Sequence, residues 1–330
     1  MAEIFPTINS TLSSIELSKV IQQKYGLSDK TECNLFRAAM NHLYVVNDDE
    51  KKYVFRVYTH NWRTKLEIEE ELRLLVHLKE TDRQVAYPIA DKSNEYIQEI
   101  NAPEGQRFGV LFSYANGVKT ANFSPQTSFV IGEALAKVHK STEGFTLNRV
   151  SYDSQSLLIN SVLQTKKFFK NTTDEIKLLE KLSNFLSAKF DTIDKQKMRY
   201  GSVHLDVWFD NMHFEDENKV TFFDFDFCGN GLLCLDISYF LFQLFSTNLN
   251  EDEYQEKADR FLKGYESVTK ISNEERSFLP FACLAIMTYY ISIQCERFDY
   301  WTNIFLNEDH LKRFTGNLNR WIAYNKIEIK

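Results

Sequence analysis

Residues 201–214, GSVHLDVWFDNMHF, set two aspartates, an asparagine and two histidines among bulky apolar side chains. Residues 220–231, VTFFDFDFCGNG, add two more acids within a run of phenylalanine. A carboxylate among apolar neighbours is destabilised unless a cation or several hydrogen-bond donors meet it. These two stretches therefore predict a site in which acids face a positively charged partner.

The spacing of these polar residues fits the needs of phosphoryl transfer. Asp206 and Asn211 form a D-x4-N pattern, and Asp224 lies on what reads as the second strand of a hairpin with the turn EDENK. The hairpin would bring Asn211 and Asp224 together, and their amide and carboxylate oxygens suit Mg²⁺. Asp206 would then orient an acceptor hydroxyl and take its proton. Taken alone, a D-x4-N pattern in a hairpin is more often a solvated turn.

The composition is that of a globular protein with room for two lobes. The chain has 330 residues, of which 43% are hydrophobic and 26% are charged, and its net charge is −7. An acidic chain lacks the basic face that a nucleic acid or an anionic membrane requires, so neither partner is expected. The same charge is compatible with a cationic small molecule as partner.

The cysteines and the apolar segments indicate a cytoplasmic protein. The five cysteines are odd in number and form no C-x-x-C pair, which favours free thiols over disulfides or a zinc ribbon. No basic region followed by an apolar stretch begins the chain, so no secretory signal is expected. The most apolar segment, residues 278–293, is shorter than a membrane span and is predicted to be a core helix.

The order of predicted elements divides the chain into a β-rich part and a helical part. Ser13 with Glu16 resembles a capping box before a helix that stops at Gly26. Four β-rich runs and one helix, KLEIEEELRLLVHLKE, complete the first part. From about Thr127 the runs have helical spacing, and only residues 202–227 interrupt them with two short strands. The sequence thus predicts an α+β chain with a small antiparallel sheet in residues 1–115 and a mainly helical lobe in residues 116–330.

The motifs resemble a known superfamily. HLDVWFDN and FFDFD resemble the H-x-D-x4-N and D-x-D motifs of the aminoglycoside phosphotransferase and choline kinase-like superfamily, which shares the protein-kinase fold. YVFRVYTHNW, GVLFSYANG, IGEALAKVHKS and GNGLLCLDISYFL are similar to further segments of that fold, in the right order. Motifs in the expected order are far more specific than any one of them. The resemblance extends to homoserine kinase-like and stress-response kinase-like branches, and it implies a bilobal protein-kinase-like fold.

In the helical lobe the resemblance implies the catalytic residues. Asp206 would be the catalytic base, and Asn211 and Asp224 would hold Mg²⁺. His204 would support the catalytic loop through hydrogen bonds. Asp236 would be structural, bonding the backbone of the same loop.

In the β-rich lobe the resemblance implies a binding site for ATP. Arg56 would stand where a phosphate-contacting lysine is usual, paired with Glu71, or with Glu70 if the register is shifted. Backbone groups near Ser113 and Ala115 would meet the adenine. A further residue, Asn41, would help to cover the phosphates.

Two positions depart from the superfamily pattern. Leu205 stands where glycine is usual, and we expect it to adopt ordinary backbone angles. Arg56 replaces lysine, and because a guanidinium binds phosphate well through its fork, activity is not excluded.

The sequence therefore predicts a kinase that moves the γ-phosphate of ATP to a hydroxyl of a small molecule. An amino alcohol, a homoserine-like metabolite and an aminoglycoside-type antibiotic are all acceptable acceptors. Only a short segment separates Asp224 from Asp236, too little for the activation segment with which protein kinases hold a peptide. The alternatives are a protein Ser/Thr kinase of the stress-response type and a catalytically inert nucleotide-binding scaffold with the same fold.

Overall fold

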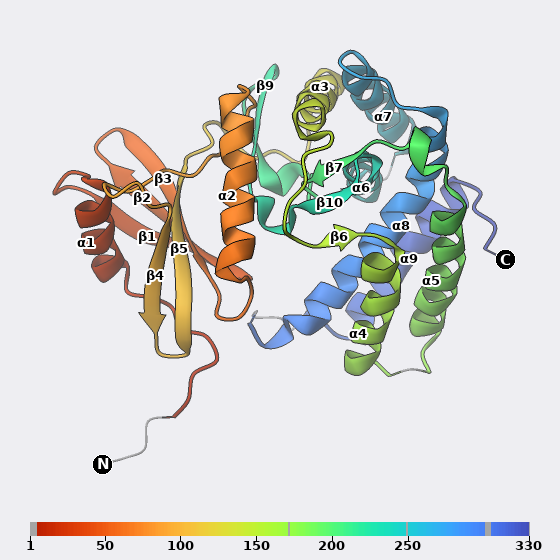
Figure 1. Cartoon of the computed structure of the whole chain (residues 1–330). Helices are drawn as coiled ribbons and strands as arrows, with labels where there is room; N and C mark the ends of the chain where they lie inside the picture. The colour runs from red at the N-terminus through yellow and green to blue at the C-terminus, as the bar shows by residue number, and fades with distance from the viewer. Residues whose placement is uncertain (1–4, 171, 249, 301–304, 330) are drawn as a thin grey trace. The chain divides into compact units, whose positions relative to one another are not determined.

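The computed structural model describes residues 5–170, 172–248, 250–300 and 305–329. The chain forms two compact units, which are described separately (Figure 1). The first unit contains Met1–Glu80, Val85–Ala115 and Arg297–Asn303, and the second contains Thr81–Gln84, Asn116–Glu296 and Ile304–Lys330. Each unit is therefore built from segments that are separated in the sequence.

The first unit is a five-stranded antiparallel sheet with two helices. The strand order is β1-β2-β3-β5-β4. The elements are α1 (Ser14–Tyr25), β1 (Glu32–Ala38), β2 (Asn41–Asp48), β3 (Lys51–Tyr58), α2 (Lys65–Glu80), β4 (Ile97–Ala102) and β5 (Gly105–Ser113).

Helix α1 begins and ends where its sequence signals predict. The Ser13 side chain accepts a hydrogen bond from the Glu16 N–H, and Gly26 ends the helix with a φ of 69°. Leu17 and Ile21 of α1 join a buried apolar cluster with strand residues such as Phe55. Burial of this cluster fixes α1 against the sheet, because each fully buried large apolar side chain contributes about 1.5–3 kcal/mol.

A segment from late in the sequence completes the first unit. Arg297 is buried, and its Nη2 donates to the Thr59 hydroxyl at 2.6 Å. Its guanidinium lies 3.8 Å from the ring centroid of Tyr300 and 4.8 Å from that of Trp62. These contacts join residues 297–300 to the loop that follows β3.

The second unit is mainly helical, with two small sheets. Its helices are α3 (Pro125–Thr142), α4 (Asn160–Phe168), α5 (Asp174–Thr192), α6 (Cys234–Thr247), α7 (Glu251–Glu266), α8 (Asn273–Glu296) and α9 (Glu308–Tyr324). Its strands are β6 (Ser151–Tyr152), β7 (Tyr200–Val203), β8 (Met212–Asp216), β9 (Lys219–Phe222) and β10 (Gly229–Leu232). One sheet has the order β6-β10-β7, and the other is the antiparallel hairpin β8-β9.

Two glycines allow α3 and α7 to pack closely. A Cβ atom on Gly132 of α3 would lie 2.0 Å from the Phe261 carbonyl oxygen. One on Gly264 of α7 would lie 1.9 Å from the Phe129 carbonyl oxygen. Only glycine fits at such a distance from a neighbouring backbone, so the two helices lie in contact along these positions.

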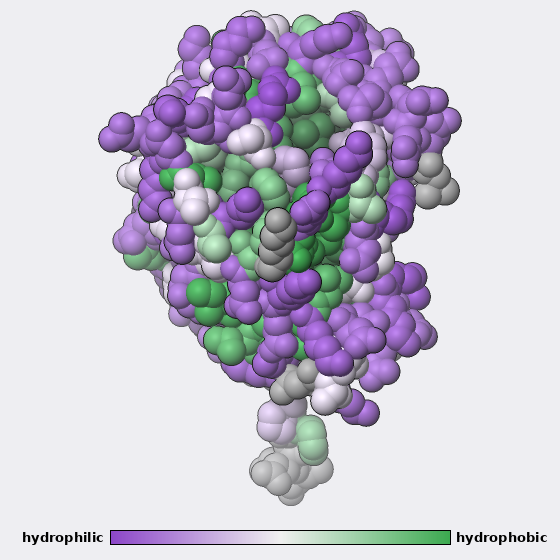
Figure 2. Space-filling view, turned by 90° about the vertical axis from the view of Figure 1, so that its right-hand side faces the viewer, coloured by the Kyte–Doolittle hydropathy of each residue, from purple (hydrophilic) through white to green (hydrophobic). Residues whose placement is uncertain are grey.

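Helix α8 contains the apolar segment noted in the sequence. Among the described residues it is the one helix long and apolar enough to cross a membrane, and 67% of its most apolar window is buried. Its buried side chains include Phe278, Cys283 and Ile291, which pack within the second unit. Hydrophilic side chains cover most of the face drawn in Figure 2, and hydrophobic ones show in its middle. We interpret α8 as a core helix.

The structure corrects two expectations about the second unit. The expected helices stop before α9, and β6, β7 and β10 lie wholly or partly outside the predicted interruption of residues 202–227. Asp224 does not lie on a strand, because β9 ends at Phe222 and Asp224 adopts left-handed angles, φ 64° and ψ 61°. Aspartate tolerates this conformation better than most residues do, which lets the chain turn sharply after the strand.

Candidate active site

The loop after β7 is held by one buried carboxylate. Asp236, in the first turn of α6, accepts a hydrogen bond from the His204 N–H at 2.8 Å on Oδ2 and from the Leu205 N–H at 2.7 Å on Oδ1. Its Oδ2 also lies 3.0 Å from Nε2 of the buried His139 on α3. The expected structural role of Asp236 is confirmed, since it positions the backbone just before Asp206.

Leu205 has a strained backbone, contrary to expectation. Its φ is 65°, in the left-handed region that favours glycine, so the expectation of ordinary angles is wrong. For an L-residue with a Cβ atom this conformation costs about 1–2 kcal/mol. The contacts that offset the cost are the bond to Asp236, a 3.3 Å bond from the Tyr290 hydroxyl to the Leu205 carbonyl, and complete burial of the leucine side chain.

The carboxylate of Asp206 is held on both oxygens by neutral donors. Nδ2 of Asn211 donates to Oδ2 at 2.7 Å, and the Tyr239 hydroxyl donates to Oδ1 at 2.9 Å. Burial raises the pKa of Asp206 above its usual value; His204 and the Tyr290 hydroxyl act against this shift, and the nearby Asp224 adds to it. Burial, and after it the Asp206 charge, raises the pKa of Tyr239 well above its usual range, so its hydroxyl stays a donor.

His204 connects this loop to the β8-β9 hairpin. Its Nδ1 accepts from the Asp206 N–H at 3.2 Å, so the ring proton lies on Nε2, which donates to the Phe223 carbonyl at 3.1 Å. The Phe223 N–H in turn donates to the Asn211 carbonyl at 3.0 Å. The expected supporting role of His204 is confirmed, and the residue before Asp224 is bonded directly to Asn211.

The donor atoms around Asn211 fit a hard cation. Its amide nitrogen donates to the Asp206 carboxylate and, at 3.0 Å, to the Asp206 carbonyl. The amide is thereby oriented, and its Oδ1 is the atom left as an oxygen donor. Asp224 follows Phe223, the residue whose N–H bonds the Asn211 carbonyl. Amide and carboxylate oxygens are the type of donor that Mg²⁺ prefers, so the chemistry of these two residues fits the metal that the motifs imply.

The ion pair predicted for Arg56 forms in the first unit. Nη1 of Arg56, on β3, lies 2.6 Å from Oε1 of Glu71 on α2. The Tyr58 hydroxyl donates to Oε2 of Glu71 at 3.0 Å and accepts from Arg56 at 3.2 Å. Both Arg56 and Glu71 are buried, whereas Glu70 pairs with the more exposed Arg73 at 2.8 Å. The pair therefore forms with Glu71 and not with Glu70.

The other residues predicted to meet the nucleotide lie at the ends of strands. Asn41 begins β2, and its Oδ1 is buried with no hydrogen-bond partner in the described part of the chain. Ser113 ends β5, and its N–H donates to the Tyr87 carbonyl at 2.9 Å, so that N–H is already used within the first unit. Ala115 is buried at the end of the segment Val85–Ala115.

Sequence reasoning missed two tyrosines near Asp206. Tyr239 lies three residues after Asp236 on α6, a spacing that places both on one helix face and was a usable signal. Tyr290 lies on α8, and nothing in its local sequence links it to the loop of Leu205.

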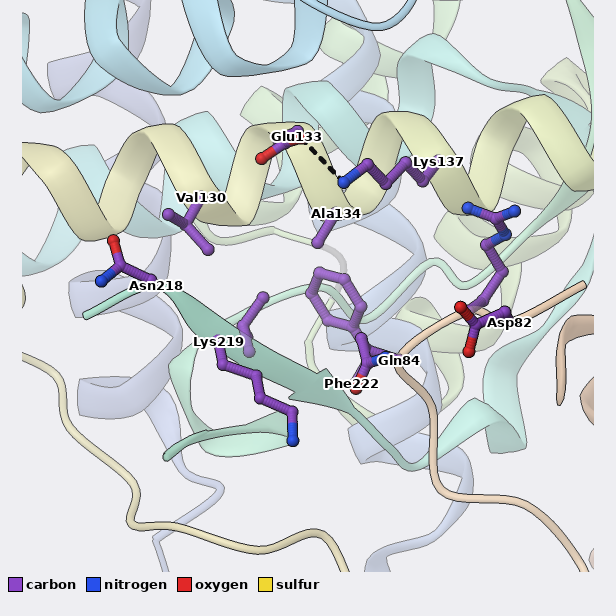
Figure 3. Close-up of a pocket in the computed structure, with 11 residues that line it drawn as sticks. Asp82, Gln84, Val130, Glu133, Ala134, Lys137, Asn218, Lys219 and Phe222 are labelled. Atoms are coloured by element: carbon purple, nitrogen blue, oxygen red, sulfur yellow. Dashed lines mark ion pairs between the residues drawn. The ribbon is translucent and has the colours of Figure 1, made fainter. Parts of the chain in front are cut away.

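A separate cavity of the second unit contains none of the predicted site residues. Its volume is about 240 Å³, and it lies between α3, the β8-β9 hairpin and the segment Thr81–Gln84. Figure 3 shows the Phe222 ring pointing toward Ala134, beside the ion pair of Glu133 and Lys137 at 2.7 Å. We assign this cavity no part in phosphoryl transfer.

Comparisons with known proteins give matches over most of the chain. Residues 35–271 match the model of the family described as "Phosphotransferase enzyme family". An uncharacterised protein of Synechocystis is 29% identical over 96% of this chain and 88% of its own length. The amicoumacin kinase of Bacillus subtilis is 24% identical over 67% of this chain and 65% of its own.

A solved structure has the same fold. The structure of a microcompartment-associated aminopropanol kinase superposes with a TM-score of 0.75 at 18% identity, covering 96% of this chain and all of that one. The α+β fold class expected from the sequence, with an antiparallel N-terminal sheet and a helical C-terminal part, is confirmed.

Proposed function

Because the chain belongs to the phosphotransferase enzyme family, we propose that it transfers the γ-phosphate of ATP to a hydroxyl group of a small molecule. The acceptor class is an amino alcohol, a homoserine-like metabolite or an aminoglycoside-type antibiotic. The compared kinases support this class, since they are named for the small molecules aminopropanol and amicoumacin. The single observation that carries the proposal is the arrangement of Asp206, Asn211 and the chain before Asp224 in one bonded loop.

Asp206 is the proposed catalytic base. Its carboxylate is held in a fixed orientation by Asn211 and Tyr239, and each carboxylate oxygen keeps a further lone pair for an acceptor hydroxyl. A hydroxyl so bound would be oriented toward the γ-phosphate and would give its proton to Asp206. Positioning of this kind supplies most of the rate in phosphoryl transfer, which asks little covalent chemistry of the protein.

The remaining roles concern charge on the phosphates. Asn211 and Asp224 would hold Mg²⁺, which supplies positive charge against the ATP phosphates when it is bound. Arg56, kept in place by Glu71, would contact the phosphates, and Asn41 would cover them. The adenine would meet backbone groups near Ala115 and the carbonyl side of Ser113.

The segment after Asp224 disfavours a protein acceptor. Between Asp224 and the start of α6 at Cys234 the chain forms only a short helical turn and strand β10. No platform for a peptide exists in this segment, which favours a small molecule. A scaffold without activity has no need of the oriented Asn211 amide.

ADP release with Mg–ATP across a panel of hydroxyl acceptors tests the proposal. We expect one acceptor class to give turnover, and Asp206→Asn to lower that turnover at least about 100-fold while Mg–ATP still binds, because an amide is no base. Asp216→Asn, an exposed change in the same unit, is the matched control and should leave turnover unchanged.

Two results would count against the proposal. If Asp206→Asn turned over nearly as fast as the unaltered protein, Asp206 would not be the catalytic base. No turnover with any acceptor, together with no thermal shift on adding Mg–ATP, would favour the inert scaffold.

A further inference from the structure

Each oxygen of the Asp206 carboxylate has its own neutral donor, and the two donors come from different places. Asn211 belongs to the same loop and to the D-x4-N motif. Tyr239 belongs to α6 and to the segment GNGLLCLDISYFL, in which no role was expected of it, and its hydroxyl lies 2.9 Å from Oδ1. Tyr239 is only 3% exposed, so its hydroxyl needs a hydrogen-bond partner inside the protein, and that partner is the Asp206 carboxylate.

A second tyrosine supports the first. The rings of Tyr239 and Tyr290 stack with centroids 5.2 Å apart and an interplanar angle of 15°. The Tyr290 hydroxyl donates to the carbonyl of Leu205, the strained residue just before Asp206. The stacked pair thus bonds both the Asp206 carboxylate and the peptide that precedes it, from helices α6 and α8.

This geometry restricts how the carboxylate can turn. The last torsion of an aspartate side chain is broad, so an unsupported carboxylate samples many orientations. With Asn211 on Oδ2 and Tyr239 on Oδ1, a rotation breaks both hydrogen bonds at once. The lone pairs that remain on the two oxygens then have a fixed direction, which an in-line reaction requires of the group that orients the acceptor.

We propose that Tyr239 is a positioning residue for phosphoryl transfer, which holds Asp206 through its hydroxyl, and that Tyr290 supports it by holding the Leu205 peptide. The inference rests on the proposed function, because it assumes that Asp206 is the catalytic base. In this proposal the Tyr239 ring packs in the core, and only its hydroxyl positions Asp206. Replacing Tyr239 by phenylalanine removes the hydroxyl and keeps the ring.

The test compares three tyrosine-to-phenylalanine variants. Tyr239→Phe and Tyr290→Phe each remove one hydroxyl beside the loop, and Tyr254→Phe is the control. Tyr254 is equally buried, but it lies on α7 and packs against Phe245, near the end of α6, and Trp321 of α9. The measurements are kcat and KM for Mg–ATP, with the acceptor found in the panel or with water in its place, and the melting temperature.

For Tyr239→Phe we expect kcat to fall about ten-fold, the effect of one lost hydrogen bond to a charged group. The KM for Mg–ATP should stay within about two-fold, because the phosphates are held by other residues. Tyr290→Phe should lower kcat about three-fold, since its hydroxyl holds the Leu205 carbonyl through a longer bond of 3.3 Å and also favours the charged form of Asp206. Each melting temperature should fall by only a few degrees, because one hydrogen bond is lost while the ring stays in the core.

Two outcomes would overturn the positioning role. The first is a kcat of Tyr239→Phe equal to that of Tyr254→Phe. The second is a fall in kcat that accompanies an equal loss of Mg–ATP binding and a lower melting temperature, which would show a structural role. Asp206→Asn in the same assay separates the two proposals. If Asp206→Asn stays active, the catalytic base is wrong. If Asp206→Asn is inactive and Tyr239→Phe keeps the kcat of Tyr254→Phe, only the positioning role fails.

Discussion

The buried charges of the two units are handled in opposite ways. In the first unit, Arg56 and Glu71 lie 2.6 Å apart, so their charges cancel inside the protein, and Tyr58 bonds to both. In the second unit, Asp206 forms no ion pair with any described residue and is bonded through neutral donors instead, while Asp224 adds further negative charge. The comparison teaches that the first unit balances a buried charge with an opposite charge, whereas the second unit orients a buried carboxylate with neutral hydrogen-bond donors.

The largest expected effect is a loss of turnover caused by a change in the second unit. In Asp224→Asn the donor set for a hard cation loses its negative charge, so we expect turnover with Mg–ATP to fall at least about 1,000-fold. The same change removes the repulsion between Asp224 and Asp206, which acts in favour of the folded state. Steady-state kinetics against Mg²⁺ concentration and a urea titration measure both effects. A large loss of stability in this variant would mean that Asp224 supports the fold and that the loss of turnover does not report on the metal.

A smaller effect, a loss of stability, is expected from a change in the first unit. Glu71→Gln leaves the buried Arg56 guanidinium facing a neutral amide, which should lower the free energy of unfolding by about 3 kcal/mol. Glu70→Gln is the matched control on the same helix, and the loss of its surface pair with Arg73 should cost less than about 1 kcal/mol. Urea titrations of both variants decide the point. Equal stabilities would mean that the buried pair does not hold the first unit together.

The smallest effect sharpens the comparison by measuring the strain beside Asp206. Leu205→Ala and Leu205→Gly remove the same buried side chain, but only glycine relieves the left-handed backbone. We expect the glycine variant to be more stable than the alanine variant by about 1 kcal/mol. At Val207, which is also fully buried but has no positive φ, the same two changes should show the usual order, with alanine more stable. Urea titrations that rank alanine above glycine at both positions would contradict the strain at Leu205.

Features with local signals could be predicted from the sequence. The cap at Ser13, the end of α1 at Gly26 and the β8-β9 hairpin follow from residues close together in the chain, and all three were expected. The pairing of Arg56 with a glutamate of the following helix was also expected, from the resemblance and with Glu71 and Glu70 both left open. The resemblance to the phosphotransferase superfamily, built on motifs in order, is confirmed.

Features that depend on distant segments could not be predicted in this way. Strands β6 and β10 are too short to have a periodicity of their own, and they form only because residues far apart in the sequence pair. The left-handed angle of Leu205 results from Asp236 and Tyr290, neither of which is near it in the chain. Helix α9 is different, since Asn307 caps it and its buried residues repeat at helical spacing. Its signal was present in the sequence and was overlooked.

The contacts of Arg297 with Thr59 and Trp62 affect where the chain can be cut to express the first unit by itself. A fragment that ends at residue 115 contains every strand of the five-stranded sheet but not the guanidinium that bonds and stacks on the loop after β3. Expression of such a fragment leaves Trp62 without that cover and Thr59 without that donor. We therefore expect a fragment of the first unit to fold more stably when residues 297–300 are grafted onto it or added as a peptide.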